Sequence, residues 1–274
     1  MSGPENVSRE TSALIARIRA NLGALRARIA AAAERARRDP AGVKLLVVTK
    51  AVGPEETAAL LDCGVTEIGE NRVQDALSKA EALGERAARF NWQLLGHLQT
   101  NKVKKALGLF SGMHSLDSVR LAEALEKEMA LRAGVQGSGF RVQEHGGAVP
   151  SATPPSRTPN PEPRTRFSVF VEVNTSGDAA KTGAQEPEVR AIFEKLKTCP
   201  HLLPAGLMTM GPLSGGPEAA RPCFRRLREL FAALRAEGLA PDGCTGLSMG
   251  MTGDFEAAVE EGATVVRIGT AVFG

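Results

Sequence analysis

Residues 167–173, with the sequence Phe-Ser-Val-Phe-Val-Glu-Val, form the clearest β-strand pattern of the chain. A short, mostly apolar run of this kind is typical of a strand in a parallel sheet that is covered on both faces. Seven similar runs occur, at residues 43–49, 66–69, 92–95, 110–115, 203–208, 244–247 and 264–268. Helical patterns separate them, at about residues 54–61, 73–83, 99–107, 118–132, 186–197, 218–236 and 253–260. Eight strands that alternate with helices predict an α/β fold, a single (β/α)8 TIM barrel, with a doubly wound open sheet as the alternative.

A further helix is predicted before the first strand, over roughly residues 8–38. Its apolar side chains recur every three or four residues, at Leu14, Ile15, Ile18, Leu22, Leu25 and Ile29. The dipeptide Asp39-Pro40 ends this pattern. Because the sequence stops at Gly274, directly after the eighth strand, we expect no helix to follow that strand. The N-terminal helix is expected to fill the vacant place in the outer ring.

Residues 134–165 interrupt the alternation of strands and helices. This segment contains six Pro and few apolar residues, a composition typical of a disordered surface insertion. It lies between the fourth predicted helix and the strand at 167–173. We therefore predict one domain over residues 1–274, with an insertion at about 134–165 in place of a domain boundary.

The overall composition argues against several classes of function. The chain has 34 Lys and Arg against 31 Asp and Glu, a net charge of +3, and its aromatic content is 4%. Neither value favours a nucleic-acid-binding surface. The four Cys and four His lack the spacing of a zinc site, so no metal is expected. No segment has the roughly 20 apolar residues of a membrane span. A cytoplasmic protein is therefore the expectation. A monomer is also expected, because no exposed apolar stripe remains once the helices are docked.

Candidate site residues should follow the strands, because the active sites of such barrels lie at the carboxyl ends of their strands. Lys50 directly follows the first strand, whereas Lys44 lies at its other end. A lysine that enters an enclosed cavity is readily deprotonated by desolvation, and an uncharged amine is what imine formation with an aldehyde requires. The alternative interpretation of Lys50 is an ordinary solvated lysine at a strand end.

Polar residues also follow the second, third and fourth strands. Asn71 is either a pocket residue or a helix cap, and His97 either faces the cavity or caps the next helix. Asp117 is interpreted as a helix N-cap. His114 and His201 have no evident partner in the sequence, so neither is assigned a function.

The last quarter of the chain contains two glycine and hydroxyl motifs. Ser248-Met249-Gly250-Met251 follows the seventh strand, and Arg267-Ile268-Gly269-Thr270 ends the eighth. Loops at these two places commonly bind a phosphate through exposed backbone N–H groups. Together with Lys50 they indicate a ligand with an aldehyde at one end and a phosphate at the other, such as pyridoxal 5'-phosphate. Arg267 would then contact the ring nitrogen and keep it unprotonated, because an arginine does not give up its proton.

With these residues the sequence resembles a known family, the pyridoxal phosphate homeostasis proteins, which are single-domain relatives of the alanine racemase N-terminal barrel. The resemblance runs from about Leu45 to Gly274, except for the Pro-rich segment. Its markers are Val48-Thr49-Lys50, Gly69-Glu70-Asn71 with Gln74, Gly96-His97-Leu98-Gln99 with Asn101-Lys102, Val173 to Gly177 with Lys181 and Gly183, Gly206-Leu207-Met208, Leu247 to Met251, and Val266 to Gly274.

The resemblance implies specific roles for the motif residues. Lys50 would hold pyridoxal 5'-phosphate as a covalent imine, Ser248, Gly269 and Thr270 would contact the phosphate, and Arg267 would contact the ring nitrogen. Asn71 and Met249 would line the same pocket. The family is thought to buffer the cofactor or to deliver it to apo-enzymes that depend on it, as part of intracellular vitamin B6 homeostasis, without catalytic turnover.

The chain departs from the family pattern after Lys50. Many relatives have a second lysine close behind the imine lysine, and here Ala51-Val52-Gly53 takes that place. If that neighbour assists cofactor transfer, this protein would hold or release the cofactor differently.

Two enzyme classes are the alternatives to a carrier. A weak amino-acid racemase is the first, because the related barrels racemise amino acids with the imine lysine on one face and a tyrosine on the other. This chain has no Tyr, which excludes a phenol base, and no residues remain after the eighth strand for a second domain. The second is an aldolase that uses Lys50 on a phosphosugar, which leaves Arg267 without a role.

Overall fold

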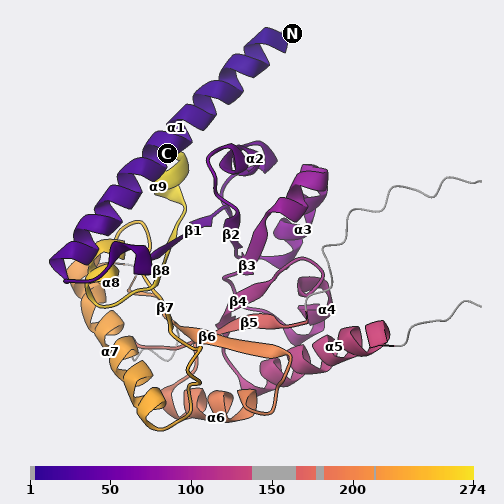
Figure 1. Ribbon diagram of the computed structural model, residues 1–274, viewed down its shortest axis with the longest axis vertical. Coiled ribbons are helices and arrows are strands. Elements are labelled where there is room, and N and C mark those ends of the chain that lie inside the picture. The colour runs from indigo at the N-terminus through magenta and orange to yellow at the C-terminus, as the bar shows by residue number, and fades with distance from the viewer. Residues whose placement is uncertain (1–3, 138–164, 177–181, 213) are drawn as a thin grey trace, which may run out of the picture.

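The computed structural model describes residues 4–137, 165–176, 182–212 and 214–274. Eight parallel strands form a closed barrel in sequence order, from β1 to β8, with β8 paired to β1 (Figure 1). The strands are β1 (Lys44–Val48), β2 (Glu67–Glu70), β3 (Asn91–Leu94), β4 (Gly112–Leu116), β5 (Phe167–Glu172), β6 (Leu202–Met208), β7 (Gly246–Ser248) and β8 (Val265–Ile268). The predicted barrel is confirmed, and the alternative of an open sheet is wrong.

Helices surround the barrel as the sequence pattern predicts. They are α1 (Pro4–Arg35), α2 (Pro54–Asp62), α3 (Val73–Leu83), α4 (Val103–Ala106), α5 (Val119–Gly137), α6 (Glu186–Leu196), α7 (Gly216–Ala236), α8 (Phe255–Glu260) and α9 (Thr270–Phe273). Short 3-10 turns lie at Pro40–Gly42, Gly84–Arg89 and Thr100–Lys102.

The long N-terminal helix α1 completes the outer ring. It runs along α8 and α9 (Figure 1), and Ile18, Leu22, Leu25 and Ile29 on its inner face are at most 4% exposed. Asn21 Nδ2 donates hydrogen bonds to the carbonyl oxygens of Val272, at 3.1 Å, and Gly274, at 3.0 Å. The predicted place of α1 is therefore confirmed. The expectation that no helix follows β8 is wrong, because the single turn α9 forms where the chain turns back onto α1.

Three further boundaries differ from the sequence prediction. Strand β7 begins at Gly246 and not at Cys244, because Cys244 is part of a turn in which its N–H donates to the Pro241 carbonyl. The helix predicted at 99–107 is a 3-10 turn followed by one turn of α-helix. Helix α5 extends to Gly137, so the first residues of the predicted insertion are helical. Residues 138–164, the rest of that insertion, lie outside the described residues.

Two hydrophobic cores hold the barrel together. The larger one lies between the strands and the helices, and the smaller one fills the barrel interior. Leu46, Phe170, Met208 and Val265 form the interior core and are at most 9% exposed. Alternation along a strand therefore points Lys44, Leu46 and Val48 of β1 toward the barrel axis. The chain leaves β1 toward Lys50 at the carboxyl end of the barrel.

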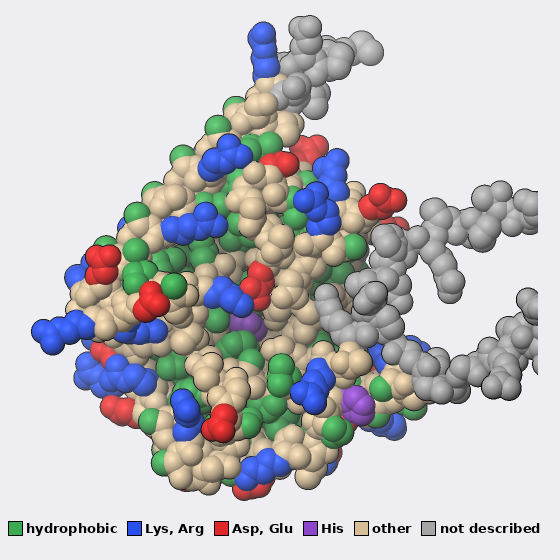
Figure 2. Space-filling model, in the orientation of Figure 1, with side chains coloured by type: hydrophobic (Ala, Val, Ile, Leu, Met, Phe, Trp, Pro, Cys, Tyr) green, Lys and Arg blue, Asp and Glu red, His purple; other side chains and the backbone are tan. Residues whose placement is uncertain are grey.

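The outer surface mixes charges of both signs. Figure 2 shows one face, on which basic and acidic side chains are interspersed over the outer helices. Ion pairs join neighbouring helices, such as Arg28 to Glu256 and Arg35 to Glu260 between α1 and α8. In the part of the chain that the structure describes, none of the helices combines the length and the apolar character that a membrane span requires.

Strands β6 and β7 approach each other closely at a pair of glycines. Gly206 pairs with Gly246, and a Cβ atom on Gly206 would overlap the Gly246 carbonyl group. We expect Gly206→Ala to lower the free energy of unfolding by about 1–3 kcal/mol, because the backbone has to shift to relieve the overlap. Denaturant-induced unfolding measures this change.

The matched control is Gly23→Ala in α1, where an added Cβ meets no atom within 4 Å. Alanine in a helix interior is expected to stabilise the protein by roughly 0.5–1 kcal/mol. Equal unfolding free energies for Gly206→Ala and the wild type would contradict the close approach of β6 and β7.

Candidate functional site at the carboxyl end of the barrel

The seam between β1 and β8 brings the first and last motifs of the chain together. Val47 pairs with Ile268, so Gly269 lies beside Val48, and a Cβ on Gly269 would be 2.8 Å from the Val48 carbonyl oxygen. The glycine thus permits the close approach of the two strand ends. Lys50 and Thr270 lie two residues beyond the ends of β1 and β8, and both are exposed.

Lys50 differs from its predicted environment. The prediction is an enclosed cavity, and the structure places Lys50 in a turn at the rim, with its side chain exposed. The reason is that β1 ends at Val48, two residues before Lys50. Lys44 lies at the opposite end of β1, as predicted, in an ion pair with Glu67 at 3.2 Å.

Arg267 lies in the barrel interior and is 5% exposed. Its guanidinium donates to Ser248 Oγ at 2.7 Å and to the Thr209 carbonyl oxygen at 3.0 Å. Burial lowers the pKa of Arg267 to about 10, while the charges of Asp254 and Glu172 oppose this shift. The side chain is therefore cationic at neutral pH, although its two hydrogen-bond partners are neutral.

His114 extends this polar layer across the barrel. Its Nδ1 atom is 2.8 Å from Ser248 Oγ, and its ring lies 4.3 Å from the ring of Phe170, centroid to centroid. Burial lowers the pKa of His114 well below its ordinary value, and the charges of Arg267 and Lys44 lower it further. The imidazole is therefore neutral at physiological pH.

His114 is a site residue that the sequence analysis missed. It faces the barrel axis because of strand alternation, which is a signal present in the sequence. Its partner Ser248 is on β7, far along the chain, and no local pattern reveals that pairing.

The motif after β7 divides its side chains between two environments. Ser248 faces the barrel interior, whereas Met249 is fully buried in the outer core and donates its N–H to the Val265 carbonyl at 3.0 Å. The structure therefore does not bring the Met249 side chain to the opening of the barrel. Gly250 has a φ of 94°, and its carbonyl accepts the N–H of Arg267 at 2.9 Å. This turn fixes the β7 loop against β8.

None of the three polar residues singled out after β2, β3 and β4 caps a helix. Asn71 is half-buried and precedes the α3 N-cap residue, Arg72, so the interpretation of Asn71 as a cap is wrong. His97 Nδ1 lies 2.9 Å from Asp117 Oδ2, which joins the ends of β3 and β4. The N-cap interpretation of Asp117 is also wrong, because Ser118 Oγ accepts the N–H of Leu121.

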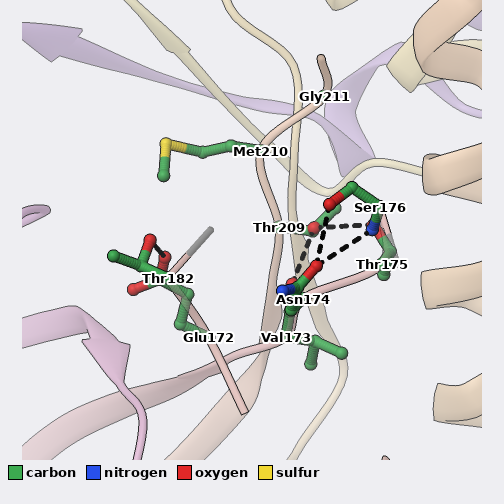
Figure 3. A pocket seen from close by; sticks show the side chains of 9 residues that line it. All are labelled: Glu172, Val173, Asn174, Thr175, Ser176, Thr182, Thr209, Met210 and Gly211. Carbon is green, nitrogen blue, oxygen red and sulfur yellow. Dashed lines mark hydrogen bonds between the residues drawn. The ribbon is translucent and has the colours of Figure 1, made fainter. Parts of the chain in front are cut away.

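A cavity of 130 Å³ opens at the ends of β5 and β6 (Figure 3). Its lining consists of Glu172, Val173, Asn174, Thr175, Ser176, Thr182, Thr209, Met210 and Gly211. Glu172 is 4% exposed and accepts a hydrogen bond from Thr182 Oγ1 at 2.6 Å. Burial raises the pKa of Glu172, which the bond from Thr182 partly offsets. Because Thr209 also binds Arg267, this cavity adjoins the polar layer of the barrel.

A turn held by side-chain hydrogen bonds follows β5 and begins at Asn174. Asn174 Oδ1 accepts the N–H of Ser176 at 3.2 Å and the Ser176 hydroxyl at 2.9 Å, as Figure 3 shows. The next two markers of this segment, Gly177 and Lys181, lie outside the described residues.

The closed barrel has an exposed lysine beyond β1 and loops with glycine and hydroxyl residues after β7 and β8. Residues 20–274 match the sequence family described as alanine racemase, N-terminal domain. The chain belongs to this family. It shares the fold of the alanine racemase of Corynebacterium glutamicum, with a TM-score of 0.63 and 15% identity over 95% of this chain and 60% of that one.

Closer relatives place the chain more narrowly. It is 38% identical to the pyridoxal phosphate homeostasis protein of Aquifex aeolicus, over 90% of this chain and 93% of that protein. It is 34% identical to the protein of the same name from Pseudomonas aeruginosa, over 93% and 94%. The chain therefore belongs to the family of the pyridoxal phosphate homeostasis proteins. PipY of Synechococcus elongatus, solved with pyridoxal phosphate bound, has a TM-score of 0.71 and 28% identity over 94% of this chain and all of PipY.

The buried neutral His114 predicts a specific pH dependence of stability. Unfolding exposes the ring, which then binds a proton below about pH 6.5, so falling pH favours the unfolded chain. We expect the difference in free energy of unfolding between the wild type and His114→Gln to be constant above about pH 7. Below about pH 6.5 it should decrease by up to about 1.4 kcal/mol per pH unit. Denaturant unfolding between pH 5 and 8 measures this difference.

His201→Gln controls for the removal of a histidine from a partly exposed position, where Nδ1 lies 2.7 Å from Glu126. Parallel stability curves for the wild type and His114→Gln across this pH range would refute a neutral, buried His114.

Proposed function

We propose that this protein binds pyridoxal 5'-phosphate as an imine on Lys50 and takes part in intracellular vitamin B6 homeostasis. Two findings support the proposal. The relatives described above are named for this role, and PipY has been solved with the cofactor bound. In addition to these two findings, the residues of this chain fit the chemical groups of the cofactor.

Arg267 is the observation that carries the proposal. A buried guanidinium is costly unless its charge and its N–H groups are satisfied, and here both hydrogen-bond partners are neutral. An additional acceptor above the barrel interior would accept a further N–H of the guanidinium, and a pyridine nitrogen is such an acceptor. Because arginine remains protonated at neutral pH, Arg267 would donate a hydrogen bond to that nitrogen without protonating it.

The other residues fit the remaining groups of the cofactor. The aldehyde carbon would condense with the amine of Lys50, with release of one water molecule. Gly269 and Thr270 would bind the phosphate where α9 begins, with Ser248 below them. Asn71 would line the pocket from the end of β2. Met249 would contribute through its packing beneath the loop, because its side chain lies in the outer core.

The homeostasis role requires that the cofactor be held and then released. We propose that the protein buffers the cofactor or delivers it to apo-enzymes, as a monomer in the cytoplasm. The four cysteines are free thiols, which fits a reducing compartment. The exposed rim position of Lys50 favours exchange, because an amine from solution can reach the carbon that Lys50 holds.

Lys50→Ala tests the assignment of the imine lysine. We expect the wild type, when mixed with pyridoxal 5'-phosphate, to develop the yellow absorption of an imine, and borohydride reduction to fix the adduct on the peptide that contains Lys50. Lys50→Ala should lack that absorption and that adduct. Peptide mass mapping after reduction locates the modified lysine.

The matched control is Lys44→Ala, which removes a lysine from the other end of the same strand. It should retain the absorption of the wild type. An adduct on Lys44 or Lys181 in the wild-type protein would overturn the assignment.

A measurement of catalytic turnover distinguishes the proposed role from the alternative function, a weak amino-acid racemase. Proton abstraction at an α-carbon on the face opposite Lys50 needs a second base, and the chain has no tyrosine to supply a phenol. We therefore expect racemisation and decarboxylation of amino acids by the cofactor-loaded protein to remain well below about 1 per second. Chiral chromatography of the amino acid after incubation measures the rate, and turnover at or above that rate would favour the enzyme.

A further inference from the structure

A buried polar cluster lies directly beneath Lys50 and consists of Thr49, Glu70 and Lys79. Lys79 Nζ donates to Glu70 Oε1 and to the Thr49 carbonyl oxygen, both at 2.5 Å. Thr49 Oγ1 donates to the same Glu70 oxygen at 2.7 Å. Thr49 is fully buried, Glu70 is 1% exposed and Lys79 is 8% exposed. The cluster joins the end of β1, the last residue of β2 and the middle of α3.

The Thr49 carbonyl also closes the turn that carries Lys50. It accepts the N–H of Val52 at 3.2 Å, so residues 49–52 form a turn with Lys50 at its second position. The Thr49 N–H donates to the Gly69 carbonyl at 3.0 Å. The backbone N–H, the carbonyl and the hydroxyl of Thr49 are thus all bonded, and the carbonyl accepts from both Val52 and Lys79.

This geometry bears on Lys50 because the Thr49 carbonyl and the Lys50 nitrogen belong to one peptide plane. A peptide unit is planar, so the direction of its carbonyl fixes the direction in which the next residue leaves. By holding the Thr49 carbonyl, Lys79 therefore influences the direction in which the Lys50 side chain leaves the backbone. The two lysines have different environments. The ammonium of Lys79 is paired and buried, whereas Lys50 is exposed.

A purely stabilising role accounts poorly for this cluster. A buried ion pair gains little over apolar side chains of the same size, because both charges lose their hydration. Apolar side chains would bury the same space without binding the Thr49 carbonyl. The ion pair has the additional effect of holding that carbonyl.

We infer that Lys79, held by Glu70, is a positioning residue for Lys50. Its ammonium fixes the Thr49 carbonyl and the turn at 49–52, and thereby places the Lys50 amine where an aldehyde can reach it. The inference rests on the proposed function, in which Lys50 forms the covalent bond.

The test uses a double variant, because Lys79→Met alone would leave the Glu70 carboxylate buried without its cation. In Lys79→Met/Glu70→Gln both charges are removed, and the new side-chain amide still offers an oxygen to the Thr49 hydroxyl. We expect this variant to fold, with an unchanged circular dichroism spectrum. We expect it to form the Lys50 adduct with pyridoxal 5'-phosphate roughly 10- to 100-fold more slowly than the wild type, since small displacements of a reacting group have effects of this size. Stopped-flow absorption and quantitative peptide mapping measure the adduct.

A second readout requires no cofactor. Hydrogen exchange of the Val52 amide reports whether the turn at 49–52 is closed, and it should be at least about tenfold faster in the double variant. Lys79→Arg retains the charge and should restore part of the protection.

The control is Arg228→Met/Glu261→Gln, which removes another ion pair with a buried carboxylate, at 2.9 Å, from the amino-terminal end of the barrel. It should leave both the adduct rate and Val52 exchange unchanged. The positioning role would be overturned if Lys79→Met/Glu70→Gln had the adduct rate and the Val52 exchange rate of the wild type. It would also be overturned if the control variant changed both rates equally. Neither outcome would affect the assignment of the wild-type adduct to Lys50. An adduct on another lysine in the wild type would overturn the proposed function and this inference together.

Discussion

The pairing of β8 with β1 is the constraint on which the rest of the site depends. It closes the barrel and brings residues from the two ends of the chain into one place, with Leu46 beside Arg267 and Val47 beside Ile268. Gly269 permits this approach because it has no side chain to collide with the Val48 carbonyl. Helix α1 supports the seam from outside, where Asn21 binds the carbonyls of the last turn. An open sheet would leave Arg267 at a solvated edge, where its charge would have no specific use.

The barrel interior consists of an apolar layer and a polar layer. Leu46, Phe170, Met208 and Val265 form the apolar layer, and burial there contributes to stability without regard to the ligand. The polar layer of His114, Ser248 and Arg267 contributes less to stability, because its groups lose hydration. Its hydrogen bonds instead fix the guanidinium in one orientation. A cation held in this way by neutral partners is preorganised for an acceptor from outside the chain.

The three lysines of this region owe their different roles to their surroundings. Lys44 forms an ion pair with Glu67 at the amino end of β1, and Lys79 forms a buried pair with Glu70. Lys50 lies in the turn between β1 and α2, exposed at the rim. Chemical type therefore does not distinguish these side chains. Their positions, at the two ends of β1 and on α3, decide which of the three amines is held in an ion pair.

The sequence by itself determined the architecture and the place of the candidate site residues at the ends of their strands. Strand and helix periodicities are local, so the eight runs and their order could be predicted, and with them the position of Lys50 at the carboxyl end of β1. The glycine and hydroxyl motifs after β7 and β8 are likewise local. Only the tertiary structure decided the bond between His114 and Ser248, the pairing of Lys79 with Glu70 and the place of Met249 in the outer core. These depend on register and on contacts between distant elements. Asp117 was misassigned, and the cap alternative for Asn71 failed, for the same reason. A polar residue before a helix has one local pattern whether it caps that helix or faces a neighbouring strand.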